Sequence, residues 1–160
     1  LSAGKMDIYE AYSEIKKIKD VRQFTGILYG LSFVGVALFF TMMLGGDFTD
    51  CMVAGIAGLA MAVTQWVLTP FGFNSFFLNM ISTLSMALTA VGFKKFLLPG
   101  INIDLVIIGG IMPIVPGVVF TTAMRDTLNG DYTAGVSRML ETGVVAFAVA
   151  VGVALAYVIL

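Results

Sequence analysis

Five long runs without a charged residue divide this sequence, and they constrain the fold more than any other feature. The runs cover residues 24–44, 51–68, 76–93, 105–123 and 142–160, and each is 18 to 21 residues long. At 1.5 Å per residue, a helix of this length reaches about 27 Å or more, close to the ~30 Å hydrocarbon core of a bilayer. The runs are continuous rather than alternating, so strands of a barrel are not expected. The sequence therefore predicts an all-α integral membrane protein built as a five-transmembrane-helix bundle.

The composition excludes most other classes of protein. Hydrophobic residues make up 59% of the chain and charged residues only 12%, whereas soluble domains carry roughly 25% charged residues. A net charge of −1 gives no basic field for nucleic acid. Histidine is absent and Cys51 is the single cysteine, which excludes an internal disulfide and a Cys/His zinc site. No enzyme motif is present, so we expect a non-enzymatic protein without cofactor or metal.

Residues 1–22 have a different character, because they hold nine of the nineteen charges. Apolar residues recur there at spacings of three and four, which predicts a short amphipathic helix: Ile8, Ala11, Ile15, Ile18 and Val21. This helix is interpreted as the tail of a cytoplasmic domain, with a membrane-surface helix as the alternative. Because the chain begins at Leu1, we expect a fragment or processed product with a domain upstream.

The distribution of lysine and arginine predicts the orientation in the membrane. Residues 1–22 contain five basic residues, and Arg125 and Arg138 fall on the same side of a five-span topology. Only Lys94 and Lys95 fall on the other side. The excess of seven basic residues over two favours a cytoplasmic N-terminus in the plasma membrane.

Two prolines interrupt the fourth run near its midpoint. Pro113 and Pro116 lack an N–H and crowd the carbonyls of Gly109 and Met112, so the sequence predicts a proline-broken fourth helix. Broken helices at the membrane midplane are typical of substrate sites in transporters. A simple kink in a packed helix is the alternative.

A charged connector follows, with five charges between residues 125 and 141. It contains a turn signal at residues 129–130, and Asp131 can cap the next helix. Arg138 and Glu141 are three residues apart and can pair. The connector is either a solvated loop or a gate. Glu141 adjoins the last apolar run, so it can be partly buried and carry a proton.

The third run has a polar face made of Ser75, Asn79, Ser82, Thr83 and Thr89. These side chains should point into the bundle. They either bond neighbouring helices or line a polar path, and Gln65 in the second run can do either.

The fourth run and the connector together resemble a known family. The pattern is Pro113-x-x-Pro116-Gly117, then Arg125-Asp126, Gly130-Asp131, Gly135, and Arg138 with Glu141. It is similar to the membrane half of the threonine/serine exporter family, which includes two-component succinate exporters. The resemblance implies a cytoplasmic N-terminal domain, a five-helix membrane half and proton-driven export of small amino acids or dicarboxylates. It also implies a second membrane half, fused or separate.

We therefore predict a transporter subunit that exports threonine, serine or a related small carboxylate. The alternative is a structural subunit that stabilises a partner, and a channel ranks below both. The lipid bilayer, the substrate and a second membrane half or another copy are the expected partners. The candidate substrate-binding or gating residues are Asn79, Pro113, Pro116, Gly117, Arg125, Asp126, Asp131, Arg138 and Glu141. Of these, Arg125 is assigned to the substrate carboxylate or the gate, and Asp126 and Glu141 to proton coupling or ion-pair gating with Arg138.

Overall fold

The structure, a computed structural model, describes residues 26–160, and every regular element in that range is helical. This confirms the all-α prediction. The elements are α2 (Gly26–Met43), α3 (Phe48–Leu68), η1 (Thr69–Phe71), α4 (Ser75–Gly92), η2 (Phe93–Leu97), α5 (Ile103–Ile111), α6 (Gly117–Leu128) and α7 (Tyr132–Ile159). The amphipathic helix predicted for residues 1–22 lies outside the described residues.

Four helical segments in the described range are long and apolar enough to cross a membrane: Gly26–Met43, Phe48–Phe71, Ser75–Leu97 and Tyr132–Ile159. The chain is thus a multi-pass membrane protein. The remaining predicted span, 105–123, is not one long helix. Its residues are divided between α5, a non-helical stretch at 112–116, and α6.

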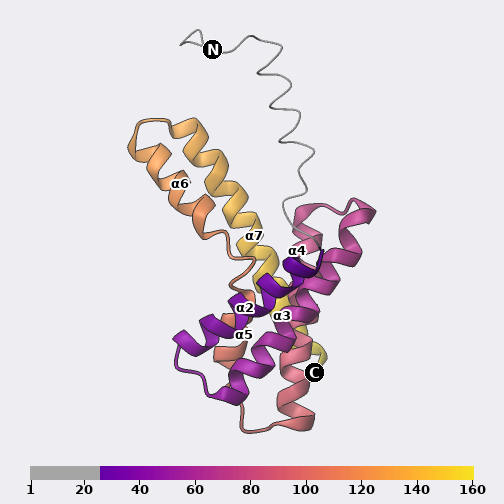
Figure 1. Cartoon of the computed structure of the whole chain (residues 1–160). Coiled ribbons are helices and arrows are strands. Elements are labelled where there is room, and N and C mark those ends of the chain that lie inside the picture. Colours follow the sequence, from indigo (N-terminus) through magenta and orange to yellow (C-terminus); the bar gives the residue numbers. More distant parts are fainter. Residues whose placement is uncertain (1–25) are drawn as a thin grey trace, which may run out of the picture.

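Figure 1 shows α2, α3, α4 and α5 packed into a bundle, with α7 running along it and beyond it. α6 packs mainly against the first half of α7, and the two project from the bundle as a hairpin. The 28 residues of α7 extend about 42 Å, which exceeds the ~30 Å hydrocarbon core. One end of α7 therefore reaches beyond the depth that a membrane helix needs.

Small residues let the helices of the bundle approach closely. A Cβ atom on Gly58 would lie 3.0 Å from the Phe33 carbonyl oxygen of α2, and one on Gly152 would lie 2.6 Å from the Met80 carbonyl oxygen of α4. The side chain of Ala37, on the face of α2 toward α3, is fully buried. Close backbone approach of this kind is how helices associate in lipid, where apolar burial gives little driving force.

A buried carboxylate fixes where α5 begins. Asp50, in the first turn of α3, is only 4% exposed. Its two oxygens accept the backbone N–H of Asn102 at 2.9 Å and that of Asp47 at 3.1 Å. Asn102 is the residue before α5. Asp50 thus ties the start of α5 to α3, and the position of the break that follows α5 depends on this anchor.

Candidate functional site

The described structure has a break between α5 and α6, and both Pro113 and Pro116 lie in it. α5 ends at Ile111, whose carbonyl accepts the N–H of Ile114 at 3.0 Å in a tight turn and that of Val115 at 3.2 Å in one last helical bond. Pro113 and Pro116 can donate no backbone hydrogen bond. The next helix, α6, begins at Gly117.

The break leaves backbone groups free on both sides. The carbonyls of Met112, Pro113 and Ile114 accept no hydrogen bond from residues 26–160. At the start of α6, the N–H groups of Val118 and Val119 have no acceptor in the same part of the chain. A helix N-terminus carries partial positive charge, and the free carbonyls carry partial negative charge. Groups of both signs therefore lie within a few residues of each other.

A cavity of 380 Å³ lies beside the break. It is in the size range of small-molecule sites, about 300–1,000 Å³. Its walls come from the first turns of α2 and α4, the end of α3, the break, and the middle of α7. The lining residues are Tyr29, Phe33, Gln65, Asn79, Pro113, Ile114, Pro116, Val119, Glu141, Thr142 and Val145.

One wall of the cavity is a chain of neutral polar side chains. The hydroxyl of Tyr29 donates to Oε1 of Gln65. Nε2 of Gln65 donates to Oδ1 of Asn79 at 3.4 Å, and Nδ2 of Asn79 donates to the Ser75 hydroxyl at 3.5 Å. Gln65 and Asn79 are buried, and Tyr29 is half-buried. Among the polar residues of α4, Asn79 thus bonds a neighbouring helix and also lines the cavity. Thr83 and Thr89 instead donate to carbonyls of α4 itself.

Glu141 is the only charged residue that lines this cavity among residues 26–160. It is exposed rather than partly buried, which corrects the expectation from the sequence. Glu141 lies inside α7, which starts at Tyr132, and lines the cavity without being covered by other side chains. The expected pairing of Glu141 with Arg138 is also wrong for the described structure.

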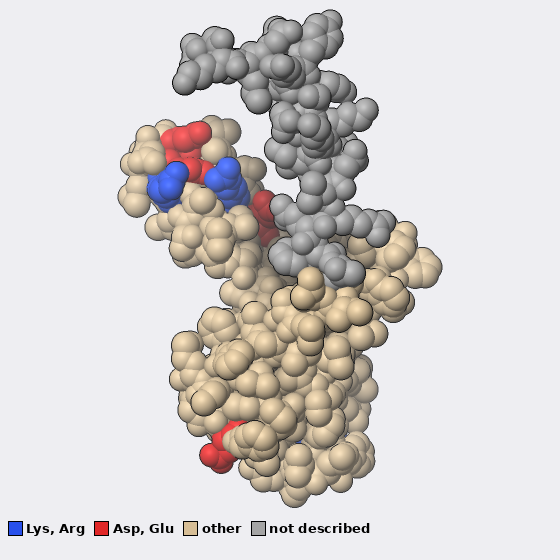
Figure 2. Space-filling view, in the orientation of Figure 1, with Lys and Arg blue, Asp and Glu red and all other residues tan. Residues whose placement is uncertain are grey.

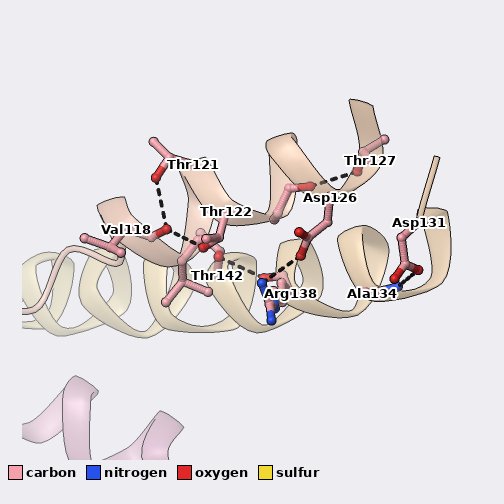
Figure 3. Close-up of polar contacts among 11 residues, drawn as sticks. Val118, Thr121, Thr122, Asp126, Thr127, Asp131, Ala134, Arg138 and Thr142 are labelled. Carbon is pink, nitrogen blue, oxygen red and sulfur yellow. Dashed lines mark hydrogen bonds and ion pairs between the residues drawn. The ribbon is translucent and has the colours of Figure 1, made fainter. Parts of the chain in front are cut away.

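Arg138 instead pairs across the α6–α7 hairpin, as Figure 3 shows. Its Nη1 atom lies 2.7 Å from Oδ2 of Asp126, and the two side chains are 47% and 22% exposed. Asp131 caps α7, because its Oδ1 accepts the N–H of Ala134 at 3.1 Å. Arg125 is exposed and forms no ion pair with any described residue.

Charged residues of the described part of the chain lie at its two ends. The hairpin carries Arg125, Asp126, Asp131, Arg138 and Glu141, and the other end carries Asp47, Asp50, Lys94, Lys95 and Asp104. Figure 2 shows blue and red atoms on the hairpin, a small acidic group at the opposite end, and a broad uncharged surface between them. Two charged ends separated by an apolar belt are typical of the surface of a membrane-embedded bundle.

The structure thus divides the predicted site residues into two groups. Asn79, Pro113, Pro116 and Glu141 line the cavity, and Gly117 begins α6 beside it. Arg125, Asp126, Asp131 and Arg138 belong to the hairpin and do not line the cavity.

Sequence reasoning missed Tyr29 and Thr142 as lining residues and left Gln65 undecided. The sequence itself contained a signal that Tyr29 lies in a polar part of the bundle. A phenol inside an apolar membrane helix needs a hydrogen-bond partner for its hydroxyl, so it points toward polar groups in the bundle.

A broken helical segment beside a cavity lined by polar and apolar residues, in a multi-pass helical membrane protein, is typical of membrane transporters. Over residues 1–160 the chain matches the family described as "Putative threonine/serine exporter". It belongs to this exporter family, which confirms the resemblance seen in its motifs. No curated protein and no solved structure matches the chain.

Proposed function

We propose that this chain is the membrane subunit of an exporter that carries threonine, serine or a similar small amino acid through the cavity beside the break. The observation that supports this most is that two residues with free carbonyls, one residue with a free helix N–H and one carboxylate line a single cavity of 380 Å³. They are Pro113, Ile114, Val119 and Glu141. Such a cavity suits a small zwitterion.

The two charged ends of an amino acid have complementary partners here. The substrate ammonium group would contact Glu141 and the free carbonyls of Pro113 and Ile114. The substrate carboxylate would contact the N–H group of Val119 in the first turn of α6, which lines the cavity. Ammonium groups favour carbonyl and carboxylate oxygens, and carboxylates favour helix N-termini. A dicarboxylate fits less well, because Glu141 would repel its second carboxylate.

In the membrane, α5, the break and α6 together would form the fourth of five crossings. The cavity is lined by residues near the start of α2, the end of α3 and the start of α4. The lysine and arginine distribution supports placing this end at the cytoplasmic side of the plasma membrane. A cavity near the cytoplasmic end is the loading state that an exporter requires.

The hairpin would act as the gate, and Glu141 as the proton carrier. α6 is joined to the bundle through the non-helical stretch 112–116, and it packs mainly on α7. The exposed Asp126–Arg138 pair would hold α6 and α7 together. Glu141 would bind either the substrate ammonium group or a proton, which couples export to the proton gradient.

A second membrane half, or another copy of this chain, would complete the transport pathway. Ala123 is the only buried residue of α6, and the apolar Val118 and Leu128 are 80% and 81% exposed. A second five-helix unit inserted in the opposite direction would cover such a face and form an inverted repeat.

The direct test is efflux from cells or proteoliposomes that contain the full-length protein with its partner. The vesicles are preloaded with labelled threonine, serine or succinate and assayed with and without a protonophore. We expect threonine and serine to leave, succinate to remain, and the protonophore to stop efflux. Retention of all three, with the complex verified in the membrane, would contradict the proposal and favour a structural subunit.

Arg125 tests the gate separately from the cavity. Arg125→Ala is expected to abolish efflux while the protein inserts at its normal level, because the gate would lose a cation that contacts the departing carboxylate. Insertion is measured by membrane fractionation and efflux by the labelled-threonine assay. Normal efflux would remove Arg125 from the mechanism.

A further inference from the structure

The polar wall formed by Tyr29, Gln65 and Asn79 has no role in binding the two charged ends of a substrate. We propose that this wall binds the neutral hydrogen-bonding side chain of the substrate, a hydroxyl or carboxamide, and so sets which amino acids the exporter accepts. The inference rests on the proposed function and assigns the side-chain subsite within the same cavity.

The wall has both hydrogen-bond donors and hydrogen-bond acceptors that are not used within the protein. The Tyr29 oxygen donates its proton to Gln65 and keeps its lone pairs as acceptors. Gln65 uses one N–H toward Asn79, and Asn79 uses one N–H toward Ser75, which leaves each amide one further N–H. The bonds at 3.4 and 3.5 Å are long, so a substrate hydroxyl can compete for these groups. A hydroxyl both donates and accepts, and it matches this arrangement.

The surroundings make the wall selective. Gln65 and Asn79 are less than 10% exposed, and Phe33, Ile114 and Val145 line the same cavity with apolar surface. When a ligand covers a polar site without forming hydrogen bonds to it, the donors and acceptors of the site are left unpaired. Such a ligand binds much more weakly than one that forms these bonds. Valine has nearly the shape of threonine but lacks the hydroxyl. The wall should therefore distinguish these two amino acids by hydrogen bonding rather than by size.

The charge that lines the cavity disfavours substrates with a charged side chain. No lysine or arginine lines the cavity among residues 26–160, and Glu141 is already assigned to the ammonium group. An acidic side chain would find no cation at the wall. A neutral polar side chain is the class that the wall fits.

Tyr29→Phe is the sharpest variant, because it removes one hydroxyl and keeps the ring that packs 4.8 Å from Phe33. Tyr157→Phe is its matched control, since Tyr157 lies near the other end of α7 and does not line the cavity. Gln65→Met is a second variant that removes both amide functions at similar volume. Purified protein with its partner is reconstituted in liposomes, and competition by threonine, valine, serine and alanine against labelled serine is measured.

We expect the parent protein to prefer threonine over valine, and serine over alanine. Tyr29→Phe should lower the affinity for threonine about tenfold, the effect of one neutral hydrogen bond, and leave the affinity for valine unchanged. Gln65→Met should reduce the threonine-to-valine ratio further, and Tyr157→Phe should leave it unchanged. Threonine-induced thermal stabilisation in detergent provides the same ratio independently of flux.

Three results overturn the inference or its basis, and they are distinguishable. Equal affinity of the parent protein for threonine and valine would refute a hydroxyl-binding wall. An unchanged ratio in both Tyr29→Phe and Gln65→Met would show that the wall is structural. Binding and transport of none of these amino acids by the parent protein would refute the proposed function itself.

Discussion

The cavity wall and the α6–α7 hairpin use polar side chains in opposite ways. In the wall, Tyr29, Gln65 and Asn79 are neutral, linked to one another and largely buried. In the hairpin, Asp126 and Arg138 are charged, paired and partly exposed. Buried neutral groups are costly to leave unpaired, so they suit discrimination between ligands. Exposed ion pairs open and close at little cost, so they suit movement.

The two regions also differ in how they are held. The wall joins three helices of the bundle, α2, α3 and α4. In the hairpin, α6 packs mainly on α7 and continues from α5 through the non-helical stretch 112–116, whereas α7 also packs on α4. Under the proposed function, the wall would be the fixed part of the binding site and α6 the part that moves during alternating access.

The largest effect is expected at Glu141, where the two regions meet. Glu141→Gln keeps the shape and removes the charge, so threonine transport should fall roughly 10- to 100-fold through the loss of one charge-assisted hydrogen bond. The measurement is threonine efflux at several substrate concentrations. Asp104→Asn is the matched control, because Asp104 is exposed in the first turn of α5, away from the cavity. Equal loss in both variants would show a general charge effect and no specific role for Glu141.

A second effect is expected where α6 and α7 touch most closely. A Cβ atom on Gly135 would collide with Oγ1 of Thr127 and lie 3.1 Å from the Ala123 carbonyl oxygen. Gly135→Ala should therefore separate the hairpin and destabilise the protein by about 1–3 kcal/mol, as overpacking does. Thermal unfolding in detergent measures this change.

Gly143→Ala is the matched control for Gly135→Ala. It lies in the same helix, and a Cβ atom there meets nothing within 4 Å. Removing a mid-helix glycine at an open position should be neutral or stabilising by roughly 0.5–1 kcal/mol. Equal destabilisation by both substitutions would mean that the hairpin contact is not specific.

Four of the five uncharged runs form long helices, as the sequence predicted, because a long uncharged run has no other stable form in a bilayer. The remaining run, 105–123, is divided between α5 and α6. The prolines at 113 and 116 lie where the fourth run loses its helix, since a missing N–H acts locally. The last apolar run begins at residue 142, but the helix that contains it, α7, begins at Tyr132. Asp131 caps α7, as its position after the turn predicted, so the helix starts ten residues before the apolar run.

The sequence alone could not show which side chains from different helices contact each other. Arg138 could reach Glu141 on its own helix, yet it pairs with Asp126 because α6 folds back along α7. Tyr29 could have faced lipid, yet it meets Gln65 because α2 packs beside α3. Periodicity shows which residues of a helix share a face, but the neighbour that covers the face depends on how the whole bundle packs.

The smallest effect on stability is expected at the Asp126–Arg138 pair. Its side chains are 47% and 22% exposed, so Asp126→Asn should change the free energy of unfolding by less than about 1 kcal/mol. The same substitution should still change threonine efflux if the pair holds the gate, because opening depends on the balance between states rather than on total stability. The exchanged variant Asp126→Arg with Arg138→Asp restores the pair with reversed polarity and should recover efflux. Recovery would show that the attraction between the two side chains matters. Loss in both variants would assign Asp126 to another contact, and no change in either would leave the hairpin pair without a role in transport.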